Sequence, residues 1–220
     1  MKHLTLPEIR IKDAWLLRLN VSQHLHKLWA QEGAILADDE HMKKIVKAYQ
    51  KAWNPKEKII LEAVCKLYGL SFRQNVIDVH IAPWFSAFSD PLVIGVKFTP
   101  DEFVDTLSHE LLHRLFTDNT NLPYRTNKLL DEWKRLFGDE HDFSTLVHIP
   151  VHAGLKYIYL DVLKEPERLE RDIKSSKANE KTWGTPYINA WNYVEGHDYK
   201  DINRALKQSY KELMVDHETQ

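Results

Sequence analysis

Two histidines four residues apart, with a glutamate directly after the first, are the residues of this chain best suited to catalysis. On a helix, His109 and His113 would lie about 40° apart, so both imidazoles can reach one metal ion. A tetrahedral Zn²⁺ site takes such ligands at about 2.0–2.1 Å. Glu110 would project beside that face and can accept a proton from a water molecule that the ion activates. The pattern therefore predicts metal-assisted hydrolysis.

The local sequence also predicts the helix that must carry these residues. Thr99 can cap a helix, Pro100 suits its first position, and Glu102 can complete a capping box. We therefore predict a helix over residues 100–117. A hydrophobic stripe would face the core, roughly opposite the two histidines, and consists of Phe103, Val104, Leu107, Leu111 and Leu115.

Chance is a poor explanation for this His-Glu-X-X-His pattern. The chain has twelve histidines and sixteen glutamates among 220 residues, so about 0.05 accidental matches are expected. The pattern also lies in a capped helix that directly follows a predicted strand. The competing interpretation is that two histidines and a glutamate lie on an exposed amphipathic helix without any function.

Residues 106–113, Thr-Leu-Ser-His-Glu-Leu-Leu-His, resemble the active-site helix of the zincin metallopeptidases, and the resemblance is gluzincin-like. The resemblance implies zinc, a water nucleophile and hydrolysis of a peptide or protein substrate. It also implies a mixed sheet whose edge strand binds extended substrate, for which 92–98 is the candidate and 82–89 the rival. The metzincin pattern is not followed, because Phe116 and Asn119 stand where that pattern needs glycine and histidine.

A catalytic zinc site needs a third protein ligand, and one segment offers two further histidines. His148 and His152 fall within an apolar helical face that is defined by Leu155, Tyr159 and Val162. Burying imidazoles costs free energy unless each finds a partner, which a metal would supply. We favour His148 as the third ligand, with His152 as an alternative ligand or a supporting group one turn on.

Glu132 is the rival third ligand. It follows His113 after 18 residues, and the resemblance to gluzincins implies a glutamate from a following helix at about that distance. However, Glu132 would lie about 100° from the centre of the apolar stripe of its own helix, a position typical of solvated glutamates. A histidine ligand in its place would depart from the gluzincin pattern.

Hydrolysis also needs a hydrogen-bond donor for the oxyanion of the tetrahedral intermediate. Tyr187 is the candidate, because it stands at a predicted helix start after a loop. His197, in a turn after Gly196, is a second one. The competing interpretations are a packing role for Tyr187 and simple exposure for His197.

The whole chain is expected to form a single α+β domain, residues 1–220, mostly helical and zincin-like, with a small mixed sheet packed beside the active-site helix. Its parts would be a helical N-terminal part over 1–70, strands within 72–98, the active-site helix over 100–117, and a helical C-terminal part over 124–220. The strands are predicted at 75–81 and 92–98.

Two details of this scheme concern helix ends. In the N-terminal part, Pro55 is expected to stop one helix, and a further helix over 56–68 is expected to end at Gly69. In the C-terminal part, residues 174–179 are expected to form a loop.

Composition limits the partners. Thirty Lys and Arg against 32 Asp and Glu give a net charge of −2, so no global field attracts nucleic acid or an anionic membrane. Lys43, Lys47 and Lys51 recur four apart, which favours a solvated helix face over a nucleic-acid patch. The single cysteine, Cys65, fits a reducing compartment. No signal peptide or membrane-spanning run is evident, and we expect a cytoplasmic protein.

These patterns together predict a zinc metallopeptidase in which Glu110 acts as general base and acid. The alternative is a non-catalytic, zinc-stabilised regulatory or binding protein. In that case His109, His113, His148 and His152 would close a four-ligand site. The substrate and the oligomeric state cannot be deduced from the sequence.

Overall fold

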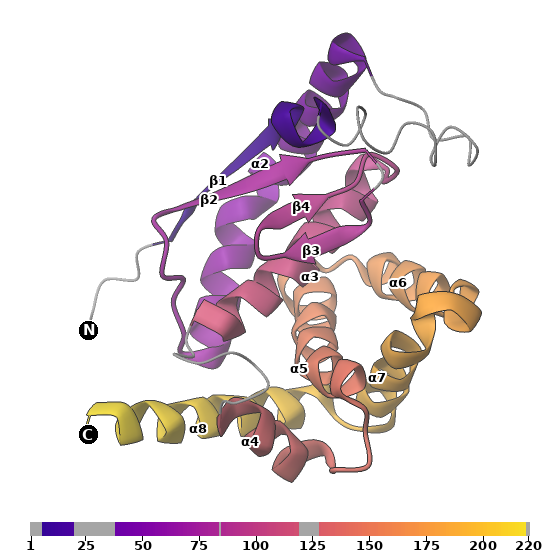
Figure 1. The fold of residues 1–220 in the computed structure, drawn as a ribbon. Coiled ribbons are helices and arrows are strands. Elements are labelled where there is room, and N and C mark those ends of the chain that lie inside the picture. The colour runs from indigo at the N-terminus through magenta and orange to yellow at the C-terminus, as the bar shows by residue number, and fades with distance from the viewer. Residues whose placement is uncertain (1–5, 20–37, 84, 119–127, 219–220) are drawn as a thin grey trace. The chain divides into compact units, whose positions relative to one another are not determined.

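The structure, a computed structural model, describes residues 6–19, 38–83, 85–118 and 128–218. It contains a four-stranded sheet and a series of helices, arranged along the chain as Figure 1 shows. This is the α+β, mostly helical class with a small mixed sheet that the sequence predicts. None of the described helices combines the length and hydrophobicity that crossing a bilayer demands.

The chain divides into two compact units, and the division passes through two helices. One unit contains the sheet, the first part of helix α2 (Asp39–Tyr68) and helix α3 (Pro100–Asp118) as far as Leu111. The other contains the last turns of α2, the rest of α3 and all later helices.

The sheet has the strand order β1-β2-β4-β3. Strand β1 (Glu8–Asp13) pairs in parallel with β2 (Val76–Ile81), which pairs in parallel with β4 (Leu92–Ile94). Strand β3 (Ala87–Ser89) is antiparallel to β4 and forms one edge of the sheet, while β1 forms the other. The candidate edge strand at 92–98 is therefore wrong, since β4 lies inside the sheet, and β3 falls within the rival segment 82–89.

Strand β1 was not predicted, because the N-terminal part over 1–70 was expected to be helical. Its alternating burial shows a half-buried strand: Ile9 and Ile11 are buried, whereas the residues on either side of Ile9 are exposed. Six residues with only two buried isoleucines give a weak sequence signal. The predicted helix after residue 13 is described only to residue 19, where residues 15–19 are helical, and its remainder lies outside the described residues.

Helix α2 is continuous through Pro55, so the predicted break at that residue is wrong. It does end before Gly69, which adopts a φ of 71° and closes the helix as predicted. In the sheet-containing unit, Tyr49 of α2 stacks on Phe103 of α3 with ring centroids 4.0 Å apart. The Tyr49 hydroxyl donates to the carbonyl of Phe98 at 2.8 Å. These contacts hold the start of α3 against α2.

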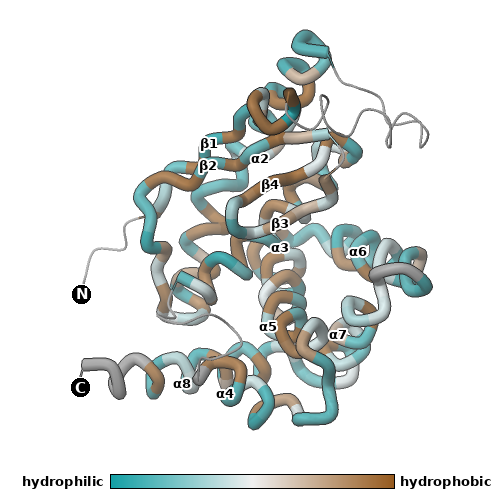
Figure 2. The backbone as a smooth tube through the Cα atoms, viewed as in Figure 1, coloured by the Kyte–Doolittle hydropathy of each residue, from teal (hydrophilic) through white to brown (hydrophobic). Residues whose placement is uncertain are grey.

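In the other unit, helix α5 (Phe143–Tyr157) is the central element, and it packs against α4 (Lys128–Phe137), α7 (Thr185–Gly196) and α8 (Tyr199–Glu218). Every residue from Thr145 to Leu155 is buried. Much of α5 is hydrophobic, whereas α6 (Pro166–Ala178) is mostly hydrophilic (Figure 2). Helix α5 continues as a π-helical segment, η3 (Ile158–Leu163).

The loop predicted at 174–179 is also wrong, because α6 runs through Ala178. A second π-helical segment, η4 (Glu180–Gly184), leads directly into α7.

Candidate metal centre

A capping box fixes the start of the helix that carries the His-Glu-X-X-His pattern. The backbone N–H of Thr99 donates to the Glu102 carboxylate at 2.8 Å, and the N–H of Glu102 donates back to the Thr99 hydroxyl at 3.3 Å. Pro100 is the first helical residue. The prediction for 100–117 is confirmed within one residue, and the start of the helix sets which side chains face the core.

Helix α3 places His109 and His113 together, one turn apart. The predicted apolar stripe is buried: Phe103, Val104, Leu107, Leu111 and Leu115 are at most 1% exposed. His109 and His113 are only partly buried. The two imidazoles are therefore held by a helix whose other side is anchored in the hydrophobic core.

Helix α5 supplies the third imidazole. Asp142 caps this helix by accepting from the Thr145 backbone N–H at 3.0 Å. Two turns later, His148 is buried, and its Nδ1 lies 2.6 Å from the carbonyl oxygen of Ser144. Because a carbonyl can only accept, Nδ1 carries the proton, which leaves the lone pair of Nε2 for another partner.

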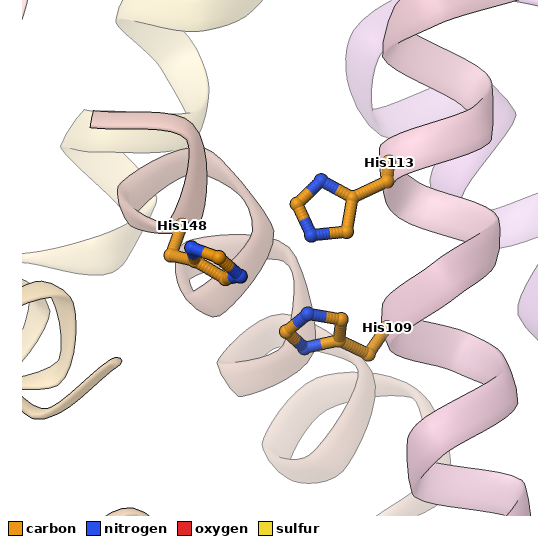
Figure 3. A group of neighbouring side chains, drawn as sticks. All are labelled: His109, His113 and His148. Carbon is orange, nitrogen blue, oxygen red and sulfur yellow. The ribbon is translucent and has the colours of Figure 1, made fainter. Parts of the chain in front are cut away.

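His109, His113 and His148 each offer one ring nitrogen to a common point (Figure 3), and these three atoms lie within 4.8 Å of one another. The rings of His113 and His148 meet edge to face, with centroids 5.0 Å apart and planes at 88°. Among the described residues, this is the group of His, Cys, Asp or Glu side chains arranged to hold a metal ion. The group contains the favoured third candidate, His148, and contains neither His152 nor Glu132.

The chemistry of these donors suits zinc. Burial lowers the pKa of His148 to about 4, so its imidazole is neutral near pH 7 and can donate a lone pair. Three imidazoles match the nitrogen-rich set that Zn²⁺ accepts in a catalytic site, where a fourth position is left for water or substrate. The bond from Nδ1 to Ser144 is the kind of contact that orients a histidine ligand.

Glu110 is a buried acid on α3, in the position directly after His109. Its side chain lies next to His109 in sequence, and the residue is 7% exposed. Burial raises the pKa of its carboxyl to about 8. A cation held by the neighbouring histidines would stabilise the carboxylate and lower that pKa. A carboxyl group that can both take and give a proton near neutral pH is what general acid–base catalysis needs.

His152 lies one turn after His148 and is fully buried. Its ring stacks on Trp191 of α7, with centroids 4.3 Å apart and planes at 14°. The Trp191 indole N–H donates to Asp172 at 3.3 Å, and the Tyr159 hydroxyl donates to the same carboxylate at 3.1 Å. His152 is thus part of a packed aromatic layer behind His148.

Tyr187, the candidate oxyanion donor, lies next to His148 and His152. Its ring is 4.0 Å from that of His148 and 6.0 Å from that of His152, between centroids. Tyr187 comes near the start of α7, after Pro186 in the first turn of that helix. The structure therefore brings Tyr187 against a candidate metal ligand.

Glu132 and His197 have other partners. The Glu132 carboxylate accepts from Arg135 Nε at 2.8 Å, and this hydrogen bond lowers its pKa. His197 is exposed and stacks on Tyr193, with its Nδ1 2.7 Å from the Tyr193 carbonyl oxygen. Neither residue joins the three-histidine group.

Gly154 is a residue that the sequence analysis missed. A Cβ at this position would lie 2.8 Å from the Tyr68 hydroxyl oxygen and 3.0 Å from two carbons of Leu112. The glycine therefore allows α5 to approach α3 beside His113. A glycine inside a long buried apolar helix is the sequence signal that points to such a close approach.

The chain matches no protein-family model, no curated protein and no solved structure. The chemistry of the site itself is therefore the basis for assigning a function.

Proposed function

We propose that the protein is a zinc-dependent metallopeptidase that hydrolyses a peptide or protein substrate. The observation that carries the proposal is the convergence of His109, His113 and His148, each with a ring nitrogen within 4.8 Å of the others. The buried Glu110, directly after the first of these histidines, supports catalysis over a purely structural role.

In this proposal each side chain has a separate task. His109, His113 and His148 bind the metal, and the Ser144 carbonyl holds the His148 ring in the tautomer that leaves Nε2 available. A bound zinc ion would polarise the scissile carbonyl and lower the pKa of water towards about 7. Glu110 takes the proton of that water on a carboxylate oxygen and delivers it to the leaving amine. Tyr187 is our candidate for the hydrogen bond to the oxyanion.

The alternative is a zinc-stabilised protein without catalysis, which needs a fourth protein ligand in place of water. His152 is a further histidine beside the group, with its ring centroid 5.7 Å from that of His148. However, it stacks on Trp191 and is outside the three-histidine group. The three-donor set therefore favours the catalytic proposal. The cytoplasm is the compartment we propose, in keeping with a single, free and buried cysteine, Cys65.

The proposal is tested by measuring metal content and peptide cleavage in the same preparations. We expect one zinc per chain in the wild type and in Glu110→Gln, with cleavage of a peptide library only by the wild type. His113→Ala should lose the zinc, whereas His197→Ala, a matched change of an exposed histidine, should keep both properties. Wild-type protein that binds no zinc, or a Glu110→Gln variant that cleaves normally, would contradict the proposal.

A further inference from the structure

A second candidate binding site lies in the sheet-containing unit, between strand β1 and helix α2. A cavity of about 660 Å³ opens there, lined by Ile11, Lys12, Asp13, Lys43, Val46, Lys47, Gln50, Lys51 and Asn54. Four of these nine residues are lysines, and one is acidic. The proposed peptidase chemistry uses none of them.

The charge of this cavity is only partly neutralised by neighbours. Lys12 is paired with Asp78 at 2.5 Å, and Lys43 is paired with Glu40 at 2.8 Å. The lone acid, Asp13, is paired with Arg18 at 2.9 Å. Lys47 and Lys51 are exposed, and no ion pair links either of them to another described residue. The cavity therefore presents an excess of positive charge.

The outer edge of β1 borders the same cavity. Glu8 donates its backbone N–H to Asn75 at 2.9 Å, and Ala14 donates to Ile81 at 3.0 Å, so the even-numbered residues of β1 face β2. Alternate residues of a strand direct their backbone groups to opposite sides. Ile9, Ile11 and Asp13 therefore face outward.

Only part of this outer edge is occupied. No described strand pairs with it, since β1 is the end of the sheet. The Ile9 backbone N–H donates a hydrogen bond to the Glu57 carboxylate. Ile11 and Asp13 pair with no described strand on this side, and both residues line the cavity.

The spacing of the lysines is close to the side-chain repeat of an extended peptide. Lys43, Lys47 and Lys51 are four residues apart on α2, which places them about 6 Å apart along the helix axis. Side chains on one face of an extended peptide repeat at about 6.7 Å. A strand that runs along α2 and carries an acidic residue at every second position would thus match the spacing of the lysine row.

We infer that the cavity between β1 and α2 binds an extended acidic peptide, which adds as a strand to the outer edge of β1 and pairs its carboxylates with Lys43, Lys47 and Lys51. Strand addition supplies main-chain hydrogen bonds, and the lysines supply the charge selectivity. Single-stranded nucleic acid also spaces its charges regularly. However, its recognition uses aromatic rings for base stacking, and none of the residues lining the cavity is aromatic.

The test is fluorescence anisotropy with the full chain and a labelled octapeptide that alternates Glu and Thr. We expect saturable binding that weakens as salt is raised. A peptide of the same composition with its four Glu contiguous should bind at least about threefold more weakly, because only alternate residues share a face. Mass spectrometry of the recovered peptide excludes cleavage as the cause of any signal.

Charge reversal locates the site. Lys47→Glu combined with Lys51→Glu should weaken binding about tenfold or more, since two attractive pairs become repulsive. Lys44→Glu is the matched control on the same helix, because Lys44 is exposed and does not line the cavity; it should change the affinity less than about twofold. On peptide binding, the amides of Ile11 and Asp13 should gain protection from hydrogen exchange, whereas that of Lys12, already turned to β2, should not.

Four results would overturn the inference. They are absence of binding to the alternating peptide, equal loss of affinity in Lys44→Glu, unchanged exchange at Ile11 and Asp13, and displacement of the peptide by an equal concentration of oligothymidylate. Because none of these measurements uses zinc or turnover, they can fail while the proposed peptidase function stands, and the reverse also holds.

Discussion

The imidazole of His148 meets that of His113 edge to face, with ring centroids 5.0 Å apart and planes at 88°. The two residues are 35 positions apart in sequence and come from different helices, α3 and α5. His148 is oriented by the Ser144 carbonyl and backed by the rings of His152 and Tyr187. This relationship turns the two-histidine pattern of α3 into a three-donor group.

The first prediction identifies the third ligand. His148→Ala should lower the zinc content of the purified protein to near zero, because a two-histidine site binds zinc weakly. Glu132→Ala should keep about one zinc per chain, since that carboxylate is held by Arg135. Metal analysis of both variants by mass spectrometry is the measurement. Retention of zinc in His148→Ala together with its loss in Glu132→Ala would restore the gluzincin-like ligand set.

A second prediction concerns the close approach of α5 to α3. Gly154→Val should destabilise the protein by about 1–3 kcal/mol, because its side chain would overlap Tyr68 and Leu112. Zinc affinity should fall as well, since Leu112 precedes His113 and the displacement of α5 also shifts His148. Urea denaturation and a competitive zinc titration measure the two effects.

The matched control for this glycine is Gly196→Ala. Nothing lies within 4 Å of the Cβ that would be added at Gly196. In the Gly196→Ala variant, the free energy of unfolding should change by less than about 0.5 kcal/mol, and the zinc affinity should not change. If both variants changed the free energy of unfolding and the zinc affinity equally, the close approach of α5 to α3 at Gly154 would not be what these two properties depend on.

The sequence predicted the part of the site that is local and left open the part that is not. The spacing of His109 and His113, the capping box and the apolar stripe are all properties of one helix, so helical geometry alone predicts them. The choice between His148, His152 and Glu132 depends on how α4 and α5 pack, which involves long-range contacts. Likewise, β1 was missed although it is as long as the predicted β2, because β1 holds two hydrophobic residues, Ile9 and Ile11, whereas β2 holds four.

Pro55 is the opposite case. Its strong local signal predicts a helix end, but tertiary packing keeps helix α2 continuous. Proline removes one helical hydrogen bond and crowds the preceding turn, at a cost of about 3 kcal/mol. Helix α2 nevertheless continues, because Tyr49 and Trp53 before the proline and Ile60 and Leu61 after it are all buried. Burial of these large side chains offsets the local penalty.

The third prediction follows from this conflict. Pro55 is exposed, so Pro55→Ala restores a backbone donor without disturbing the core. We expect the free energy of unfolding to rise by about 1–3 kcal/mol in urea denaturation. Pro166→Ala is the control, because Pro166 begins helix α6, where proline is well tolerated; it should change stability by less than about 0.5 kcal/mol. A loss of stability in Pro55→Ala would mean that the proline sets a bend on which the packing of α2 depends.

The last prediction uses Asp142, the cap of the helix that carries His148. Partial burial raises the pKa of the Asp142 carboxyl, but hydrogen bonds from the Thr145 hydroxyl and from backbone N–H groups outweigh this effect, so the net pKa is lowered from 3.8. A carboxyl whose pKa is lower in the folded state stabilises the fold above its unfolded pKa, and this contribution is lost as the pH falls through the folded value. Asp142→Ala should therefore cost about 1 kcal/mol at pH 7.

The difference between wild type and Asp142→Ala should shrink once the pH drops below about 4, where the carboxyl begins to bind a proton. Asp142→Asn separates charge from capping: as a comparable cap it should retain most of the stability at pH 7, and it should lack the change with pH. Urea denaturation at a series of pH values from 7 to 3 measures all three proteins. If the difference between wild type and Asp142→Ala stayed constant down to pH 3, the lowered pKa would be refuted, because the stabilisation would not depend on the ionised carboxylate.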